Sequence, residues 1–391
     1  MAWGVNKVED QRKELIEAYI KGDVTMTELA RSFRVSRRTA YKWYNRYVLN
    51  GFDEVSLQDL SRAPHHPWSI FNDNQIQLML DMKLAHKQWG PKKILARLER
   101  DYPNERWPSA TRLYEIFKDH HLVTSRKIKR RICGTHPLGE LNQCNDVWIA
   151  DFKGWFLTLN NTKCEPLTIT DAYSRYLISC EHLPSKSSQH VWVIFEKAFR
   201  EYGLPNRLRT DNGPPFGSIG VGRLTTLSVN LIKAGVMPEW INPGHPEENG
   251  RHERFHLTLK QAVTNPPEKT LNKQMEKMRK FQQEYNFERP HEALEMNTPA
   301  SQYAASRRQW DGRLRSPEYD TKIMEVRKVH PSGCISLKKT EYYLGRALPG
   351  EYVGLQREGE GYQVYYGSVY LGYLTEGKQL LRPKRALRKK A

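Results

Sequence analysis

Long apolar runs are missing from this 391-residue chain, and none approaches the roughly 20 residues that a membrane-spanning helix requires. The opening residues carry charges where a signal peptide needs an apolar segment, so we expect neither a membrane protein nor a secreted one. Cysteine is scarce, with five scattered residues and no C-x-x-C pair. That usage argues against a disulfide scaffold and suits a reducing cytoplasm.

Acidic residues are outnumbered: 44 Asp and Glu stand against 62 Lys and Arg, which gives a formal net charge of +18. A chain with this balance usually has a polyanionic partner, and nucleic acid is the default. A merely alkaline soluble protein is the alternative, but the basic residues are clustered, which argues against it. The length suffices for about two to four domains, each with its own core.

Residues 1–58 are predicted to form a DNA-binding domain, because two short helices joined by a tight turn resemble a helix-turn-helix. The second helix is expected from Arg37 to Val48, with Ser36 as its N-cap. Arginine in the major groove reads guanine edges, and early basic positions of this helix would lie there. These positions are Arg37, Arg38 and Lys42. The inward-facing positions ahead of the turn are Leu29, Ala30, Phe33 and Val35.

Residues 69–123 are predicted to form a second helix-turn-helix domain, of plain or winged type, in which Ser109 is an N-cap candidate. Its helices are expected near residues 74–87, 91–102 and 109–121, separated by Gly90-Pro91 and Pro103. A basic linker over residues 124–145 follows. It fits contact with DNA phosphates at least as well as a solvated connection.

From residue 146 the pattern changes to strands and then to strands alternating with helices, which predicts a mixed sheet covered by helices over residues 146–305. Asp151 lies inside the first strand, where a buried carboxylate is costly without a partner or a metal. Asp211 ends a later strand within a sequence that also forms a good turn by itself, so both readings stand. Asp171 is interpreted as a turn carboxylate, paired with Arg175.

Glu253 lies in the first turn of a helix and also belongs to residues 252–256, which spell the H-E-x-x-H pattern of zinc peptidases. A peptidase helix needs a third ligand and gives no role to two DNA-binding units, so we disfavour that reading. Carboxylates suit Mg²⁺ or Mn²⁺ better than zinc, and two such ions promote phosphoryl transfer. His256 and Lys260 are expected to face DNA phosphates, since Lys260 shares the helix face of Glu253.

Alternating apolar and polar residues from position 322 predict a small β-barrel over residues 320–381, with a structural or oligomeric role. Residues 382–391 form a basic tail that suits nonspecific contact with DNA.

Taken in order, the motifs of residues 148–303 resemble the integrase-type DDE transposases of bacterial insertion sequences. The resemblance implies a ribonuclease H-like core in which Asp151, Asp211 and Glu253 are catalytic and bind two Mg²⁺ ions, for which Mn²⁺ substitutes. The spacing from Asp211 to Glu253 exceeds the commonest one, which keeps Glu247 and Glu248 as alternative third ligands. The motifs are Trp148-x-x-Asp151-Phe-Lys-Gly, Thr210-Asp211-Asn212-Gly213 and Asn242-Pro-Gly-His-Pro-x-x-Asn249-Gly-x-x-Glu253-Arg-Phe-His-x-Thr-Leu259, followed by residues 285–303.

The activity that the resemblance implies is DNA transposition. Metal-activated water would cut the ends of the element, and each exposed 3′-OH would attack target DNA. Lys260 matches a lysine that contacts the DNA end in related integrases. The implied partners are the terminal repeats, target DNA and further copies of the chain, in the bacterial cytoplasm at the nucleoid. The alternative is a non-catalytic, sequence-specific DNA-binding regulator with an inert integrase-like core, which would bind DNA without metal.

Overall fold

The computed structural model describes residues 8–60, 71–123, 141–242 and 250–375. The chain divides into two compact units, one ending at Asn72 and the other beginning at Asp73. Most of the predicted basic linker, the basic tail and the alternative ligands Glu247 and Glu248 lie outside the described residues.

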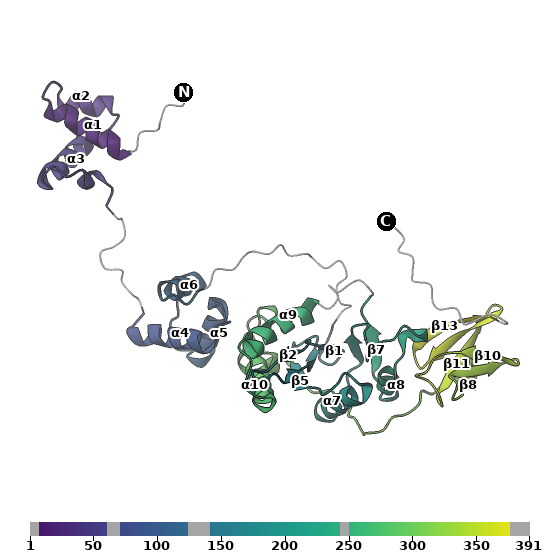
Figure 1. Ribbon diagram of the computed structural model, residues 1–391. Coiled ribbons are helices and arrows are strands. Elements are labelled where there is room, and N and C mark those ends of the chain that lie inside the picture. The colour runs from purple at the N-terminus through teal and green to yellow at the C-terminus, as the bar shows by residue number, and fades with distance from the viewer. Residues whose placement is uncertain (1–7, 61–70, 124–140, 243–249, 376–391) are drawn as a thin grey trace. The chain divides into compact units, whose positions relative to one another are not determined.

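The first unit is a small helical domain built around the predicted pair of helices (Figure 1). The Ser36 hydroxyl accepts a hydrogen bond from the Thr39 amide and so caps the second of them, as predicted. Leu29 and Ala30 are buried, but Val35 is 37% exposed, because it lies in the turn just before the cap; its inward placement was wrong. The elements are α1 Val8–Ile20, α2 Met26–Ser32, α3 Arg37–Leu49 and the 3-10 helix η1 Glu54–Leu57.

The second unit begins with three helices that match the predicted segments: α4 Asp73–Ala85, α5 Pro91–Asp101 and α6 Ala110–Asp119. Ser109 caps α6, as expected, by accepting from the Arg112 amide. Residues 71–123 contain no strand, so the described part of this region shows no wing. His86 contacts Glu284 at 3.1 Å and Arg97 contacts Glu288 at 3.1 Å, which ties these helices to the domain that follows.

The central domain contains a five-stranded sheet in the order β5-β4-β1-β6-β7. Strand β1 pairs antiparallel with β4 and parallel with β6, so the sheet is mixed, as the sequence pattern predicted. The strands are β1 Val147–Phe152, β4 Pro166–Asp171, β5 Leu177–His182, β6 Arg207–Thr210 and β7 Met237–Trp240. A separate short hairpin consists of β2 Phe156–Leu157 and β3 Lys163–Cys164.

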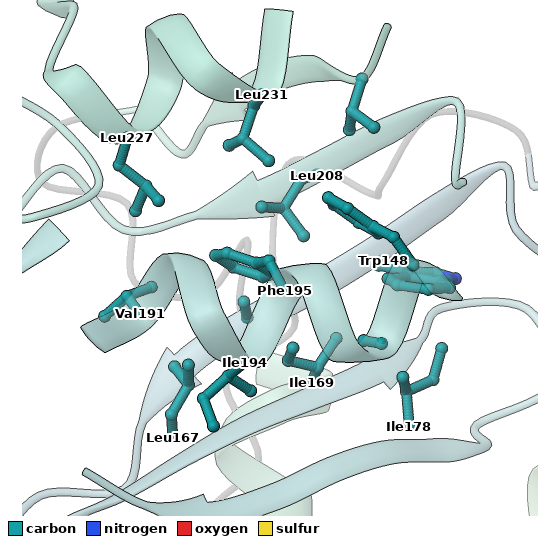
Figure 2. Close-up of a cluster of buried hydrophobic side chains, with 14 of the residues drawn as sticks. Trp148, Leu167, Ile169, Ile178, Val191, Ile194, Phe195, Leu208, Leu227 and Leu231 are labelled. Atoms are coloured by element: carbon teal, nitrogen blue, oxygen red, sulfur yellow. The ribbon is translucent and has the colours of Figure 1, made fainter. Parts of the chain in front are cut away.

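Helices α7 Ser188–Tyr202 and α8 Thr226–Lys233 cover one face of this sheet. Helix α7 carries apolar side chains at the three- and four-residue spacing of an amphipathic helix, begins at the N-cap Ser187 and ends at Gly203, whose φ is 76°. Figure 2 shows Val191, Ile194 and Phe195 of α7 against the strand side chains, with residues of α8 beside them.

Helices α9 Gly250–Leu259 and α10 Leu271–Gln283 form a second core with other sheet residues (Figure 1). From α9 and the π-helical turn after it, Phe255, Leu259 and Val263 are buried here, four residues apart along the chain. The remaining short elements are the 3-10 helices η2 Val221–Arg223 and η6 Glu292–Leu294, the π-helical turns η4 Lys260–Thr264 and η5 Glu284–Glu288, and α11 Pro299–Gln302.

The C-terminal region consists of antiparallel sheets, as the alternating pattern indicated, but a closed barrel is not shown. A four-stranded sheet has the order β13-β12-β11-β8, and β9 and β10 form a separate hairpin. Apolar side chains of these strands form one buried cluster, and Leu224 and Val229 of the central domain pack into it. The strands are β8 Met324–Lys328, β9 Cys334–Leu337, β10 Thr340–Tyr343, β11 Tyr352–Glu358, β12 Gly361–Tyr366 and β13 Val369–Thr375.

The packing of α7 on the sheet predicts a large effect of Phe195→Ala. Phe195 is fully buried in the core, so its truncation should lower stability by about 3–5 kcal/mol, the usual cost of emptying a buried phenylalanine site. Val193 lies on the same helix but is 59% exposed, and Val193→Ala should change stability by about 0.5 kcal/mol or less. Thermal unfolding of both variants measures this; similar losses would mean that α7 is placed incorrectly.

Candidate active site

Asp151 and Asp211 lie at the same edge of the central sheet. The parallel register of β1 and β6 pairs Ile149 with Arg209, and each aspartate comes two residues after that pair. Because parallel strands run in step, their carboxyl ends bring the two carboxylates to one place. The Asp151 side chain is 21% exposed, and Asp211 lies in the turn that follows β6.

The pKa values of the two aspartates reflect this shared position. Burial raises the pKa of Asp151 to about 7, helped by the negative charges of Asp211 and, less, Glu253, and opposed by the Phe152 amide and by Lys186. Burial also raises the pKa of Asp211, against the Gly213 amide and Lys186. Carboxyl groups with raised pKa values gain from a nearby cation, which offsets their desolvation and, at Asp151, the repulsion from Asp211.

Asp211 also makes the turn that its sequence allowed. Its Oδ1 accepts a hydrogen bond from the Gly213 amide at 3.2 Å. One carboxylate oxygen therefore shapes the turn, while burial and neighbouring charge act on the same group. The turn reading and the site reading are compatible at this residue.

Glu253 lies in the first turn of α9, is exposed, and affects the pKa of Asp151 across the gap between helix and sheet. Helix α9 is held there by its buried apolar side chains and by its own histidines. Asp211 and Glu253 thus both lie close enough to Asp151 to raise its pKa.

The two histidines of the H-E-x-x-H segment lie on the side of α9 that packs against the sheet, where both contact Thr168 of β4. Thr168, which pairs with Asp151 across β4 and β1, bonds through its hydroxyl to Nε2 of both His252 and His256, each at 2.8 Å. His252 is 1% exposed, and burial lowers its pKa well below the usual range. Burial lowers the pKa of His256 to about 4, with a smaller contribution from Lys153, so both rings are neutral near pH 7.

His256 was expected to face DNA phosphates, but the structure packs it against the sheet. Its Nδ1 lies 3.9 Å from Oδ2 of Asp151, and its side chain is 13% exposed. Ligand atoms of Asp151, His252 and His256 all lie within 4.8 Å of one another. The two histidines of residues 252–256 thus lie close to an acidic residue, Asp151. Nothing in the sequence indicated this proximity.

Lys186 is a second residue that sequence reasoning missed. It immediately precedes the N-cap of α7, and its charge lowers the pKa of both Asp151 and Asp211. Its Nζ lies 2.9 Å from Glu165 Oε1 and 4.6 Å from the ring centroid of Phe152. Nothing in the local sequence distinguishes this lysine, because its neighbours come from β1 and from residue 165.

Lys260 begins the π-helical turn η4 and is exposed. Burial is the main cause that lowers the pKa of Lys153, and the charge of Lys260 lowers it further. The charge of Asp151 acts in the opposite direction. Lys260 and Asp151 thus both lie close enough to Lys153 to affect its pKa. The exposure of Lys260 leaves its side chain accessible to a ligand.

Asp171 is a structural carboxylate, as predicted, with 1% exposure. Its oxygens accept hydrogen bonds from the amides of Asn145 and Ser174 and from the Ser174 hydroxyl. These groups, rather than the guanidinium of Arg175, are its hydrogen-bond donors, so the expected side-chain pair with Arg175 was wrong.

The three basic residues predicted to contact DNA are exposed on α3. Arg37 lies 5.7 Å from the ring centroid of Tyr41, and Lys42 lies 5.5 Å from that of Trp43. Arg38 is exposed between them. Their exposure leaves all three side chains accessible to a ligand along the helix.

Comparison with known families agrees with this geometry. Residues 142–246 match a family model described as the integrase core domain, and residues 234–299 match a second model of the same description. Residues 11–65 match a helix-turn-helix domain. These regions of the chain are therefore similar to a helix-turn-helix domain and to an integrase core domain.

Two relatives are encoded by insertion elements. An uncharacterized 31.7 kDa protein of IS407 from Burkholderia multivorans is 26% identical over 258 residues, which is 64% of this chain and 89% of the relative. An uncharacterized 39.2 kDa protein of IS476 from Xanthomonas euvesicatoria is 25% identical over 237 residues, or 59% of this chain and 64% of the relative. The similarity to insertion-element proteins of the integrase type is thus confirmed.

Retroviral integrase structures are among the solved structures that this chain matches. The HTLV-2 integrase catalytic core domain, solved with magnesium, has 17% identity, a TM-score of 0.33, and coverage of 41% of this chain and 98% of that one. The integrase chain of a simian T-cell lymphotropic virus intasome, solved with a PP2A regulatory subunit, has 15% identity, a TM-score of 0.38, and coverage of 78% and 99%. Among the described residues of the present chain, no helix is both long and apolar enough to span a membrane.

Proposed function

We propose that this protein is a DNA transposase that cleaves the ends of a mobile element and joins the resulting 3′-OH ends to target DNA. The observation that carries the proposal is the placement of Asp151 and Asp211 at the ends of adjacent parallel strands, with Glu253 within electrostatic range. The integrase core and the insertion-element relatives support it. We assign chemistry to residues 146–305, DNA recognition to residues 1–58 and 69–123, and a structural role to residues 320–381.

Asp151, Asp211 and Glu253 would hold two Mg²⁺ ions, or Mn²⁺ in their place. The fit rests on the donor set: carboxylate oxygens are the ligands that these cations prefer. The raised pKa values of both aspartates also show carboxylates that a cation would stabilise. When bound, such ions supply charge neutralisation at the attacking and leaving oxygens of an in-line displacement.

Lysines at the rim bind and orient the DNA. Lys260 and Lys153 lie on the α9 side of Asp151, and Lys186 lies beside both aspartates. Their ammonium groups attract the phosphates that flank the scissile bond and hold it in line with its nucleophile, which is the main protein contribution to phosphoryl transfer besides charge stabilisation. No side chain needs to form a covalent intermediate.

Sequence recognition is assigned to α3, whose exposed Arg37, Arg38 and Lys42 would enter the major groove of the terminal repeats. A transposition event joins two ends, so the active form is a homo-oligomer on DNA. A DNA-binding regulator with an inert core is the rival function. It would bind the same DNA without any dependence on metal.

Replacement of the acids tests the proposal directly. Asp151→Asn, Asp211→Asn and Glu253→Gln should each abolish cleavage and joining of terminal DNA in Mg²⁺ or Mn²⁺, because each near-isostere is a poor metal ligand. DNA binding should stay nearly unchanged. The measurement is a strand-transfer assay on the element's own ends, with EDTA as a further control.

The matched control for this assay is Glu276→Gln, an exposed acid of α10, which should retain wild-type activity. Wild-type activity of Glu253→Gln would remove Glu253 from the catalytic set. Loss of activity in Glu248→Gln would then identify the third ligand. A wild-type protein that binds the ends but never joins them, with or without metal, would favour the regulator.

Arg38→Ala separates base reading from phosphate contact. If Arg38 contacts a guanine edge bidentately, the substitution should weaken binding to the element's ends by about 1–3 kcal/mol and barely change the affinity for random DNA. Lys21→Ala, at an exposed position after α1, is the control. Fluorescence anisotropy at fixed salt measures both affinities, and an equal loss on all sequences would reduce Arg38 to a phosphate contact.

Lys260→Ala tests DNA positioning. Lys260 stands seven residues after Glu253, which is about 10 Å along the helix axis. Its loss should lower the joining rate about tenfold to a hundredfold at saturating DNA and metal, because it removes alignment and leaves the acids in place. Lys273→Ala, exposed on α10, should join at the wild-type rate. Equal rates for both variants would contradict a DNA-facing Lys260.

A further inference from the structure

Two imidazole rings lie close to a carboxylate between α9 and the sheet. A metal site made of carboxylates alone gives these rings no role. His252 and His256 come from α9, and Asp151 comes from β1. Thr168 stands opposite Asp151 on the neighbouring strand and links all three. The hydrogen bonds around this one hydroxyl determine which ring nitrogens carry a proton.

The Thr168 hydroxyl has one proton, and we assign it to the backbone carbonyl oxygen of Asp151, which can only accept and lies 3.0 Å away. The remaining contacts of that oxygen are Nε2 of His252 and Nε2 of His256, both at 2.8 Å. Because a hydroxyl oxygen that has donated its proton can only accept, both rings must donate from Nε2. Both histidines are therefore Nε2–H tautomers whose Nδ1 atoms carry lone pairs.

The two Nδ1 atoms have different surroundings. His252 Nδ1 accepts from the Thr170 hydroxyl at 3.1 Å, so that ring is satisfied on both sides and fixes the helix on the sheet. His256 Nδ1 faces Asp151 Oδ2 at 3.9 Å. A lone pair and a carboxylate oxygen at this distance do not form a hydrogen bond. A divalent cation that binds both atoms would occupy this gap.

We propose that His256 Nδ1 is a ligand, beside Asp151, of a divalent cation in the active site, and that this nitrogen makes the site prefer Mn²⁺ to Mg²⁺. The inference rests on the proposed function for the role of Asp151. Mg²⁺ is bound almost entirely through oxygen, whereas first-row transition metals accept imidazole. One nitrogen added to a carboxylate set therefore favours Mn²⁺. His252 positions His256 through Thr168 and does not itself bind the cation.

The test uses Mn²⁺ alone as the probe and does not depend on catalysis. Pulsed electron paramagnetic resonance of the Mn²⁺-loaded full-length protein should show coupling to an imidazole nitrogen. His256→Gln should abolish this coupling and weaken Mn²⁺ binding at least about tenfold, with a smaller effect on Mg²⁺. The glutamine amide nitrogen reaches the former Nε2 position, so the hydrogen bond to Thr168 is kept while the Nδ1 ligand is lost.

Two further variants complete the design. His330→Gln, at an exposed histidine after β8, should retain the coupling and the affinity. His256→Asn places an amide oxygen near the former Nδ1 position, so it should lose the nitrogen coupling and narrow the preference for Mn²⁺ over Mg²⁺. Thermal unfolding shows which variants are folded, and the asparagine variant decides the question if the glutamine variant does not fold.

The outcomes separate this inference from the proposed function. No nitrogen coupling in the wild-type protein, or coupling that persists in folded His256→Gln, would overturn the inference and leave a water between the two atoms as the explanation. Asp151→Asn should abolish Mn²⁺ binding. If it does so while His256→Gln has no effect, only the histidine ligand is refuted. If Asp151→Asn leaves Mn²⁺ binding intact, the metal site of the proposed function is refuted as well.

Discussion

The parallel pairing of β1 with β6 is the constraint on which the rest of the site depends. It carries Asp151 and Asp211 to one sheet edge, where burial raises the pKa of each carboxyl group and the charge of Asp211 further raises that of Asp151. Such an arrangement is unfavourable for an empty acidic pair, and a cation between the groups would relieve it. The fold therefore holds two acids where only a positively charged ligand makes their proximity favourable.

Two apolar cores stabilise the sheet that holds these two carboxylates together. Helices α7 and α8 bury one face of the sheet, and α9 and α10 bury other sheet residues in a separate cluster. Phe255 and Leu259 hold α9 in place, and the bonds of its histidines to Thr168 set its distance from β1. Glu253 on the exposed side of α9 then lies close enough to Asp151 to affect its pKa, because the buried side of the same helix is fixed. Lys186, just before the N-cap of α7, adds a positive charge beside both aspartates.

Much of this was predictable from the sequence, for physical reasons that differ by feature. The helices could be predicted because their signals are local in the sequence. These signals are N-caps such as Ser36 and Ser109 and the three- and four-residue spacing of apolar side chains in α7. The convergence of the acids followed only from the ordered motifs, since no local rule relates Asp151 to Asp211. The contacts of His256 with Thr168 and of Lys186 with Glu165 join residues far apart in the chain, and the sequence could not predict them. Alternation along the C-terminal strands predicted antiparallel sheets but could not determine whether those sheets close.

Anomalous X-ray diffraction from crystals of the protein soaked in Mn²⁺ tests the central claim most directly. The account predicts an anomalous peak between the carboxylates of Asp151 and Asp211, within bonding distance of both, which disappears in Asp151→Asn crystals. A second peak toward Glu253 would mark the other cation. Peaks confined to surface carboxylates such as Glu276, with none between the two aspartates, would contradict a metal-dependent active site at this sheet edge.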